Sequence, residues 1–437
     1  MRAGLFLAYW PWFSLEEQVS LAVLGDELGL DSLWVSEAWG QDAVSMLGLL
    51  AGRTQRIGLG SGLLQIPARQ PAAAAMAAAS LDVISGGRFR LGLGVSGPQV
   101  SEGWYGVPFA HPLRRTREYV EIVRTALARR TLRHEGEEWT LPLPGGQGRP
   151  LKLLAKPVQE RIPIYLGAVG PKAIEQAGEI ADGWLPFMLD PAAPDRLMDP
   201  LLRGLARAGR AREDIDIAPC VPFAVAADRD AARDAVRPWL AFYLGGMGSR
   251  EKNFYVDAAA AAGYGEPARA CQDAYLDGDR GAAAAALTTD LIDAMALATT
   301  PAGLDERLAA YERAGIDTLI AVPCGTDKEG AVRTLAAAVG AARACPAPRA
   351  AGRHPGVRSH RAMAGRHVRR PAARAPARLR AGPGVRRGVQ PQGRPRARVV
   401  RAPGCDGRAP VLHVAGRLRR AVRAAGGRAA GRGRRGL

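Results

Sequence analysis

The sequence has few cysteines, and almost no histidine outside its C-terminal part. The cysteines are Cys220, Cys271, Cys324, Cys345 and Cys405 among 437 residues, with no CxxC pair. This spacing excludes a disulfide framework and the usual zinc sites, and it favours a reducing cytoplasm. His111 and His134 are the only histidines before residue 345, and neither has a partner at metal-ligand spacing. We therefore expect no metal.

Long apolar runs are also missing. Nowhere do about 20 consecutive apolar residues occur, so we expect no membrane span. The first residues are mostly apolar, but a Trp-Pro-Trp run at 10–12 and two glutamates at 16–17 follow them instead of a small-residue cleavage site. We therefore interpret residues 3–9 as a first strand and not as a signal peptide.

Lysine and acidic residues are nearly absent from the end of the chain. Residues 346–437 hold 25 arginines, one aspartate and neither lysine nor glutamate, a charge of +24. Since the whole chain carries +18, residues 1–345 carry −6. The tail is rich in Arg, Ala, Pro and Gly without apolar periodicity, which resembles GC-rich DNA read in a shifted frame or a disordered arm. In either case we expect no packing into the rest of the chain, and we rank an RNA- or DNA-binding arm below both.

Residues 1–345 repeat a short β-branched or Leu-rich run followed by a longer amphipathic or Ala-rich stretch. This is the pattern of alternating strands and helices. After the first strand, Ser14 and Glu17 predict a capping box, and Gly29 ends the helix. The predicted strands are 3–9, 31–36, 56–62, 88–94, 162–166, 182–187, 215–225 and 317–322. Further helices are predicted near 42–53, 71–84, 114–129, 171–181, 194–209 and 328–343.

Eight strand signals within residues 1–345 predict a (β/α)8 TIM barrel with insertions, followed by the tail at 346–437. An open nucleotide-binding sheet is less suitable, because no GxGxxG follows the first strand. Two long interruptions stand at 130–161 and 229–300, and the second is Ala-rich and helical in pattern. Insertions of this length usually build a substrate cover or an oligomer contact.

Several segments together resemble a known family. They are LDSLWVSEAW at 30–39, LGSGLLQIP at 59–67, LDVISGGRF at 81–89, LGLGVSGP at 91–98, LGAVGPK at 166–172 and IADGW at 180–184. In this order and spacing they resemble the luciferase-like monooxygenase superfamily over about residues 1–345. SGPQV at 96–100 and EGWYG at 102–106 resemble the branch that uses the deazaflavin coenzyme F-420. The resemblance implies hydride transfer between F-420 and a small organic substrate.

Glu37 follows the second predicted strand, so in a barrel it would stand at the C-terminal rim, where catalytic groups collect. We predict that it donates or accepts a proton beside the transferred hydride. The alternative is that Glu37 hydrogen-bonds a neighbouring loop or the ring without titrating. Relatives that act on alcohols and sugar phosphates carry Asp-His here, whereas this chain has Glu37-Ala38, which argues against those substrates.

The resemblance also implies a set of coenzyme contacts. The predicted cofactor-binding residues are Gly62, Leu63, Gln65, Ser96, Gly97, Pro98, Gly167, Ala168, Val169 and Gly170. Gly62-Leu63 matches a place where F-420-dependent relatives hold a non-proline cis peptide, with a plain bulge glycine as the alternative. The run at 167–170 precedes a helix opening at Pro171, so its N–H groups would face a coenzyme phosphate, although a simple turn needs the same glycines. Lys172 and Arg69 would hold the anionic coenzyme tail or remain solvated.

Tryptophans complete the predicted site. Trp10, Trp12, Trp39 and Trp104 lie at predicted strand ends and are expected to wall an apolar substrate pocket, with core packing as the alternative. Two other functions stay open on the same fold: an FMN-dependent monooxygenase, and a non-catalytic deazaflavin-binding protein. We expect a small-molecule substrate and a homodimer, because dimers are common among relatives.

Overall fold

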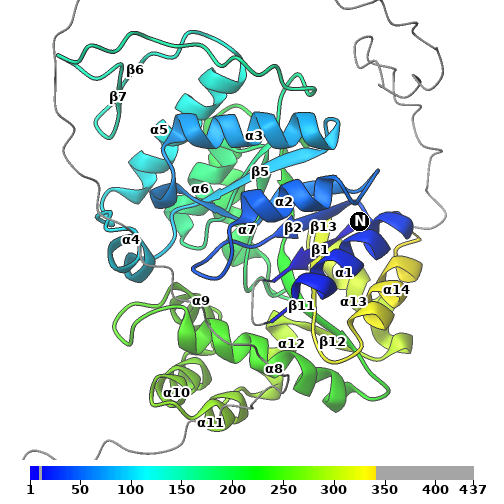
Figure 1. Ribbon diagram of the computed structural model, residues 1–437. Helices are drawn as coiled ribbons and strands as arrows, with labels where there is room; N and C mark the ends of the chain where they lie inside the picture. Colours follow the sequence, from blue (N-terminus) through cyan, green and yellow to red (C-terminus); the bar gives the residue numbers. More distant parts are fainter. Residues whose placement is uncertain (9–11, 341–437) are drawn as a thin grey trace, which may run out of the picture. The chain divides into compact units, whose positions relative to one another are not determined.

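The computed structural model describes residues 1–8 and 12–340, and its core is a ring of parallel strands (Figure 1). The ring is made of β1 (Arg2–Leu7), β2 (Ser32–Val35), β3 (Gly58–Ser61), β5 (Phe89–Gly94), β8 (Ile164–Leu166), β9 (Gly183–Trp184), β10 (Asp216–Ile217), β11 (Cys220–Val225) and β13 (Thr318–Pro323). These strands coincide with the predicted ones. The predicted tail and its boundary at residue 345 lie outside the described residues.

β10 and β11 are consecutive parts of one extended segment, and this segment closes the ring. β10 pairs with β9, β11 pairs with β13, and β13 pairs with β1, all in parallel. The N–H of Ala218 donates to the Trp184 carbonyl and the N–H of Ile320 donates to the Pro219 carbonyl, both at 2.9 Å. The closed parallel ring confirms the predicted (β/α)8 barrel.

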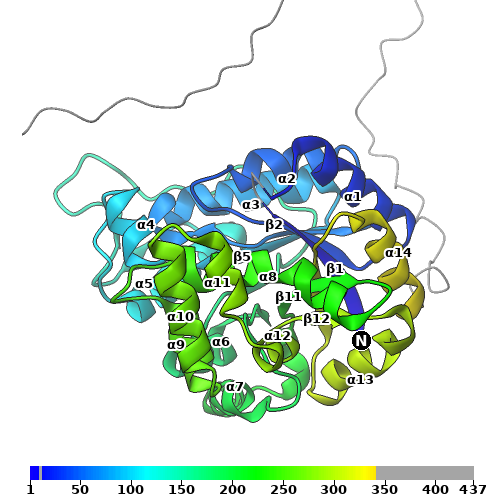
Figure 2. The ribbon, with the colours of Figure 1, turned by 90° about the horizontal axis from the view of Figure 1, so that it is seen from below.

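Helices surround the ring on its outer side (Figure 2). They are α1 (Leu15–Glu27), α2 (Ala43–Ala51), α3 (Pro71–Ser85), α5 (Pro112–Leu127), α6 (Pro171–Ile180), α7 (Asp195–Arg207), α13 (Leu304–Arg313) and α14 (Lys328–Ala338). The capping box of α1 is present, because the N–H of Glu17 donates to Ser14 Oγ at 3.1 Å and the N–H of Ser14 donates to Glu17 Oε2 at 2.8 Å. Gly29 then adopts a φ of 77°, which suits glycine just past a helix end.

The two predicted insertions differ in structure. Residues 229–300 form α8 (Arg229–Gly246), α9 (Phe254–Ala261), α10 (Gly265–Leu276), α11 (Arg280–Ala285), α12 (Thr289–Met295) and the strand β12 (Leu297–Thr299). The predicted helical character of this insertion is confirmed, and β12 pairs with β11. Residues 130–161 hold only the hairpin of β6 (His134–Glu135) and β7 (Thr140–Leu141).

Glycines make room for large rings inside the barrel. A Cβ on Gly60 would lie 2.2 Å from the Trp34 ring, and one on Gly183 would lie 2.1 Å from the Tyr165 ring. The two rings meet edge to face, with centroids 4.9 Å apart. The interior of the barrel is therefore a packed core in which side chains larger than hydrogen at 60 and 183 have no space.

Short elements complete the C-terminal rim of the barrel. They are β4 (Leu64–Gln65), the 3-10 turn Ile66–Ala68 and α4 (Pro98–Gly103). β4 extends the β3 segment and pairs with β5 through Leu64 and Gln65. Further 3-10 turns lie at Arg212–Asp214 and Pro301–Gly303.

Candidate functional site

A cavity of about 870 Å³ opens at the C-terminal ends of the barrel strands. Its walls include Ser36 just after β2, Gly62 just after β3, Gly94 at the end of β5 and Leu166 at the end of β8. Ligand sites of TIM barrels lie at this end. The volume is near the upper end of the range of roughly 300–1,000 Å³ that small-molecule sites span.

Most predicted site residues line this cavity. Those that do are Glu37, Trp39, Gly62, Leu63, Gln65, Ser96, Gly97, Gly167, Ala168, Val169 and Gly170, together with Lys172. Pro98, the first residue of α4, does not line it. Trp104 does not line it either and is 64% exposed, since α4 buries only Ser101. Trp12 packs on Trp239 with centroids 5.2 Å apart, and Trp10 lies outside the described residues.

Leu63 is held between two glycines at the rim. The Gly62–Leu63 peptide is cis, as the resemblance implied. A Cβ on Gly94 would lie 2.5 Å from Leu63 Cδ1, and one on Gly167 would lie 2.4 Å from the same atom. The glycines of β5 and of the loop after β8 therefore leave the space that the Leu63 side chain occupies.

Glu37 is the buried centre of a polar network. Arg69 donates to both of its carboxylate oxygens, with Nη2 to Oε2 at 2.7 Å, and the N–H of Ala43 also donates to Oε2 at 3.1 Å. Arg69 Nη2 also binds Asp42 at 2.6 Å. Burial alone would lower the pKa of Arg69, but its bonds to Glu37 and Asp42 raise that pKa, so the guanidinium stays charged. In this arrangement Glu37 contacts neighbouring elements, as the alternative interpretation expected.

Gln65 lines the cavity and has one acceptor without a partner. Its Nε2 donates to the Glu37 carbonyl at 3.0 Å, which fixes which end of the amide is oxygen. Its Oε1 is buried and has no hydrogen-bond partner in the described structure. Because an unpaired buried acceptor costs about 1–3 kcal/mol, a ligand donor at this position would be stabilising.

Two further features of the cavity concern the backbone. Ser96 follows β5 with a φ of 63°, a left-handed conformation that costs a non-glycine residue roughly 1–2 kcal/mol. Such strain is concentrated at ligand sites. Gly170 caps α6, and a Cβ there would meet nothing within 4 Å, so the start of this helix is open toward the cavity.

One wall of the cavity is aromatic, and sequence reasoning missed it. Phe187 follows β9, Tyr243 belongs to α8, and Phe254 and Tyr255 begin α9. We call these four residues the aromatic wall. They come from loops and from the Ala-rich insertion, whose local pattern carries no signal of a site. By contrast, no residue of 130–161 lines the cavity, so of the two expectations for that insertion only the oligomer contact stays a prediction.

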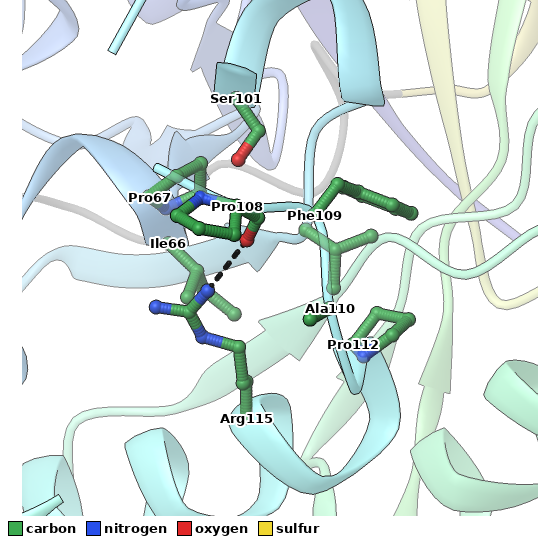
Figure 3. Close-up of a pocket in the computed structure, with 9 residues that line it drawn as sticks. Ile66, Pro67, Ser101, Pro108, Phe109, Ala110, Pro112 and Arg115 are labelled. Carbon is green, nitrogen blue, oxygen red and sulfur yellow. Dashed lines mark hydrogen bonds between the residues drawn. The ribbon is translucent and has the colours of Figure 1, made fainter. Parts of the chain in front are cut away.

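A loop beside the cavity holds one more ring in place. Arg115 Nη1 on α5 donates to the Pro108 carbonyl at 2.9 Å across a small pocket lined by Ile66 and Pro67 (Figure 3). Phe109 lines both this pocket and the large cavity. Its ring lies 6.1 Å from that of Phe254, so the loop extends the aromatic wall.

Neither a cluster of metal ligands nor a membrane-spanning helix is found in the described part of the chain. Within residues 1–8 and 12–340, no three His, Cys, Asp or Glu side chains gather as metal ligands would. His134 instead contacts Glu118 at 3.3 Å. The helices of the same residues are too short or too polar to cross a bilayer.

Comparison with known proteins supports the resemblance. A protein of Mycobacterium tuberculosis named as a coenzyme F-420-dependent oxidoreductase is 40% identical over 346 residues, covering 78% of this chain and 99% of its own. The 5,10-methylenetetrahydromethanopterin reductase of Archaeoglobus fulgidus is 31% identical over 341 residues, covering 77% and 97%. The structure of the coenzyme F-420-dependent tetrahydromethanopterin reductase of Methanopyrus kandleri matches with a TM-score of 0.68 at 26% identity, covering 77% and 97%.

The family model of the luciferase-like monooxygenases matches residues 1–318, which is nearly all of the barrel described above. Since this match spans well over half of the chain, the protein belongs to the luciferase-like monooxygenase family.

Proposed function

We propose that this protein is an F-420-dependent oxidoreductase that passes hydride between the deazaflavin and a small organic substrate. The names of the M. tuberculosis relative and of the M. kandleri reductase contain this coenzyme. The observation that carries the proposal is the buried, unpaired Oε1 of Gln65 in the wall of a cavity at the C-terminal rim. A ring system with N–H groups suits this acceptor.

Different residues around the cavity would hold different parts of the coenzyme. When bound, the coenzyme supplies or accepts the hydride at a ring carbon. Gln65 would accept an N–H of the ring, and Leu63 would support the ring beside it. The N–H groups at 167–170 and the start of α6 would face the phosphate, with Lys172 adding positive charge. The apolar remainder of the cavity excludes water from the transfer.

Glu37 stays our candidate for proton transfer, although its bonds to Arg69 and Ala43 also support a positioning role. Glu37→Gln keeps the size of the side chain and removes the carboxyl group that could exchange a proton. A change in the pH profile of kcat would support proton transfer by Glu37. An unchanged profile with a modest loss of kcat would support positioning.

Fluorescence titration of the full chain with F-420 and, separately, with FMN tests the proposed function. Salt of roughly 0.3 M is needed, because the arginines of the tail attract any polyanion at low ionic strength. We expect tight binding of F-420 and weak binding of FMN. Preference for FMN would favour the monooxygenase alternative. Binding of F-420 without hydride transfer to any of a broad substrate panel would favour the non-catalytic alternative.

Titration of the Gln65→Leu variant with F-420 tests the proposed role of Gln65. Loss of one hydrogen bond worth about 1 kcal/mol should weaken F-420 binding about fivefold. Gln41→Leu is the matched control, because Gln41 pairs with Gln18 away from the cavity. An unchanged affinity in Gln65→Leu would argue against the proposed orientation of the coenzyme.

We further propose that the family domain ends near residue 345, since the relative of 40% identity aligns over 346 residues and 99% of its own length. A cytoplasmic homodimer remains our expectation. Light scattering on the full chain and on a chain ending at 345 tests the dimer and the independence of the tail together.

A further inference from the structure

Three of the four rings of the aromatic wall, those of Phe187, Tyr243 and Tyr255, contact one another. The ring centroids of Phe187 and Tyr243 lie 4.6 Å apart at 32°. Tyr255 meets Phe187 and Tyr243 edge to face, each at 5.1 Å. Phe187 and Tyr255 are only partly buried, and both line the cavity, so part of their surface is available to a ligand.

The buried titratable groups at the wall are uncharged at neutral pH. Burial raises the pKa of the Cys220 thiol well above its usual value and that of the Tyr255 phenol to about 12, so both keep their protons. Lys252 is the cation on this side, and it is exposed, 5.1 Å from the Phe254 ring and 3.7 Å from Asp257.

The other charged groups of the cavity belong to residues that already have a role in the proposed function. Among the described lining residues, the remaining charged side chains are Glu37 and Lys172. Glu37 is already paired with Arg69, and Lys172 is exposed on α6. An anionic substrate placed against the aromatic wall would therefore lose its hydration without gaining a buried partner, which is costly.

We infer that the substrate is an uncharged molecule with an apolar ring, and that the aromatic wall binds this ring while its reacting carbon points to the coenzyme side. This inference rests on the proposed function, which assigns Leu63, Gln65 and residues 167–170 to the coenzyme. Flat aromatic side chains in offset or edge contact favour a ring over a flexible polar chain. The wall therefore determines substrate specificity.

Binding of two ketones that differ by one carboxylate group tests the inference. Isothermal titration of the full chain with 2-acetonaphthone and with 6-acetyl-2-naphthoate measures the dissociation constants without coenzyme. We expect the neutral ketone to bind at least tenfold more tightly. Equal binding of the two ketones, or tighter binding of the carboxylate or of glucose 6-phosphate, would overturn the inference.

Substitutions in the wall locate the binding. Phe187→Ala should weaken binding of 2-acetonaphthone about tenfold, because it removes ring stacking and buried apolar area. Phe187→Leu fills most of the same volume and should weaken it less, which guards against a folding defect in the alanine variant. Trp104→Ala is the matched control, since Trp104 is exposed and does not line the cavity. A loss of affinity in Trp104→Ala equal to that in Phe187→Ala would overturn the inference.

Titration of the same variants with F-420 separates the two proposals. We expect Phe187→Ala to bind F-420 within about twofold of the unchanged chain. Normal F-420 binding with no preference for the neutral ketone would overturn the inference and leave the proposed function standing. Tight ketone binding with no F-420 binding would overturn the proposed function instead.

Discussion

Arg69 and Glu37 form a two-pronged ion pair at the rim of the barrel, with a guanidinium nitrogen facing each carboxylate oxygen. The Glu37 side chain is 3% exposed and that of Arg69 is 19% exposed. Loss of Arg69 would leave the Glu37 carboxylate buried without an opposite charge, whereas Arg69 without Glu37 would keep its bond to Asp42. The pair links the end of β2 to the segment after β4 and so fixes the wall of the cavity beside Gln65.

Arg69→Leu should lower the free energy of unfolding by about 3 kcal/mol, since it leaves the Glu37 carboxylate buried and unpaired. The double variant Glu37→Gln/Arg69→Leu should recover part of this loss. Urea unfolding of Arg69→Leu, Glu37→Gln and the double variant would measure the coupling energy. Arg250→Leu is the control, because its pairs with Asp273 and Asp277 are exposed and should change stability little. Equal effects at Arg69 and Arg250 would contradict the prediction.

Gly167→Ala should reduce the affinity for F-420 about tenfold, because the new Cβ would displace Leu63 Cδ1 from the space it occupies at the rim. Gly48→Ala in α2 should bind F-420 normally, since Gly48 does not line the cavity and a Cβ there meets nothing within 4 Å. The double variant Gly167→Ala/Leu63→Ala removes the clash and tests the cause. Because Leu63 also supports the ring, the double variant is compared with Leu63→Ala alone. If Gly167→Ala weakens F-420 binding as much in the Leu63→Ala background as in the unchanged chain, Leu63 is not responsible.

Gly204→Ala should destabilise the protein by about 3 kcal/mol, because its Cβ would lie 1.9 Å from the Glu175 carbonyl oxygen where α7 crosses α6. Gly48→Ala in α2 should instead stabilise it by about 0.5–1 kcal/mol, since the position is helical and open. Thermal unfolding of the two variants would show shifts of opposite sign. Shifts of the same sign would show that the α6–α7 contact is looser than described.

Asp182→Asn should remove an acid-sensitive part of the stability. Burial alone would raise the pKa of Asp182, but Arg124, the N–H of Ile164 and Arg161 outweigh it and lower that pKa in the folded state. A lowered folded pKa gives stability that is present above the unfolded pKa of about 3.9 and is lost as pH falls below it. The variant should therefore cost about 2 kcal/mol at pH 7, and the difference should shrink below about pH 4.

Urea unfolding at several pH values would measure this difference. Asp234→Asn is the control, because the Asp234 carboxylate is 71% exposed on α8. A difference between Asp182→Asn and the unchanged chain that stays constant from pH 7 to pH 3 would contradict the assigned cause.

Much of the fold was predictable from local patterns. The barrel strands and the helices between them follow apolar periodicity, and the capping box of Ser14 and Glu17 involves residues three apart in the chain. α13 and β12 were not predicted, because α13 is rich in charge and β12 lies at the end of an insertion whose pattern is helical. Trp104 was expected in the pocket, but the direction of a side chain at the end of α4 depends on how that helix lies on the rim.

The sequence by itself determined the (β/α)8 barrel, its family and most of the glycines that line the cavity, because periodicity and short motifs are properties of neighbouring residues. Only the tertiary structure decided that Arg69 closes on Glu37, that the Oε1 of Gln65 is left unpaired, and that Phe187 meets Tyr243 and Tyr255. These contacts join segments far apart in the chain. Their existence depends on strand register and helix packing, which no local pattern records.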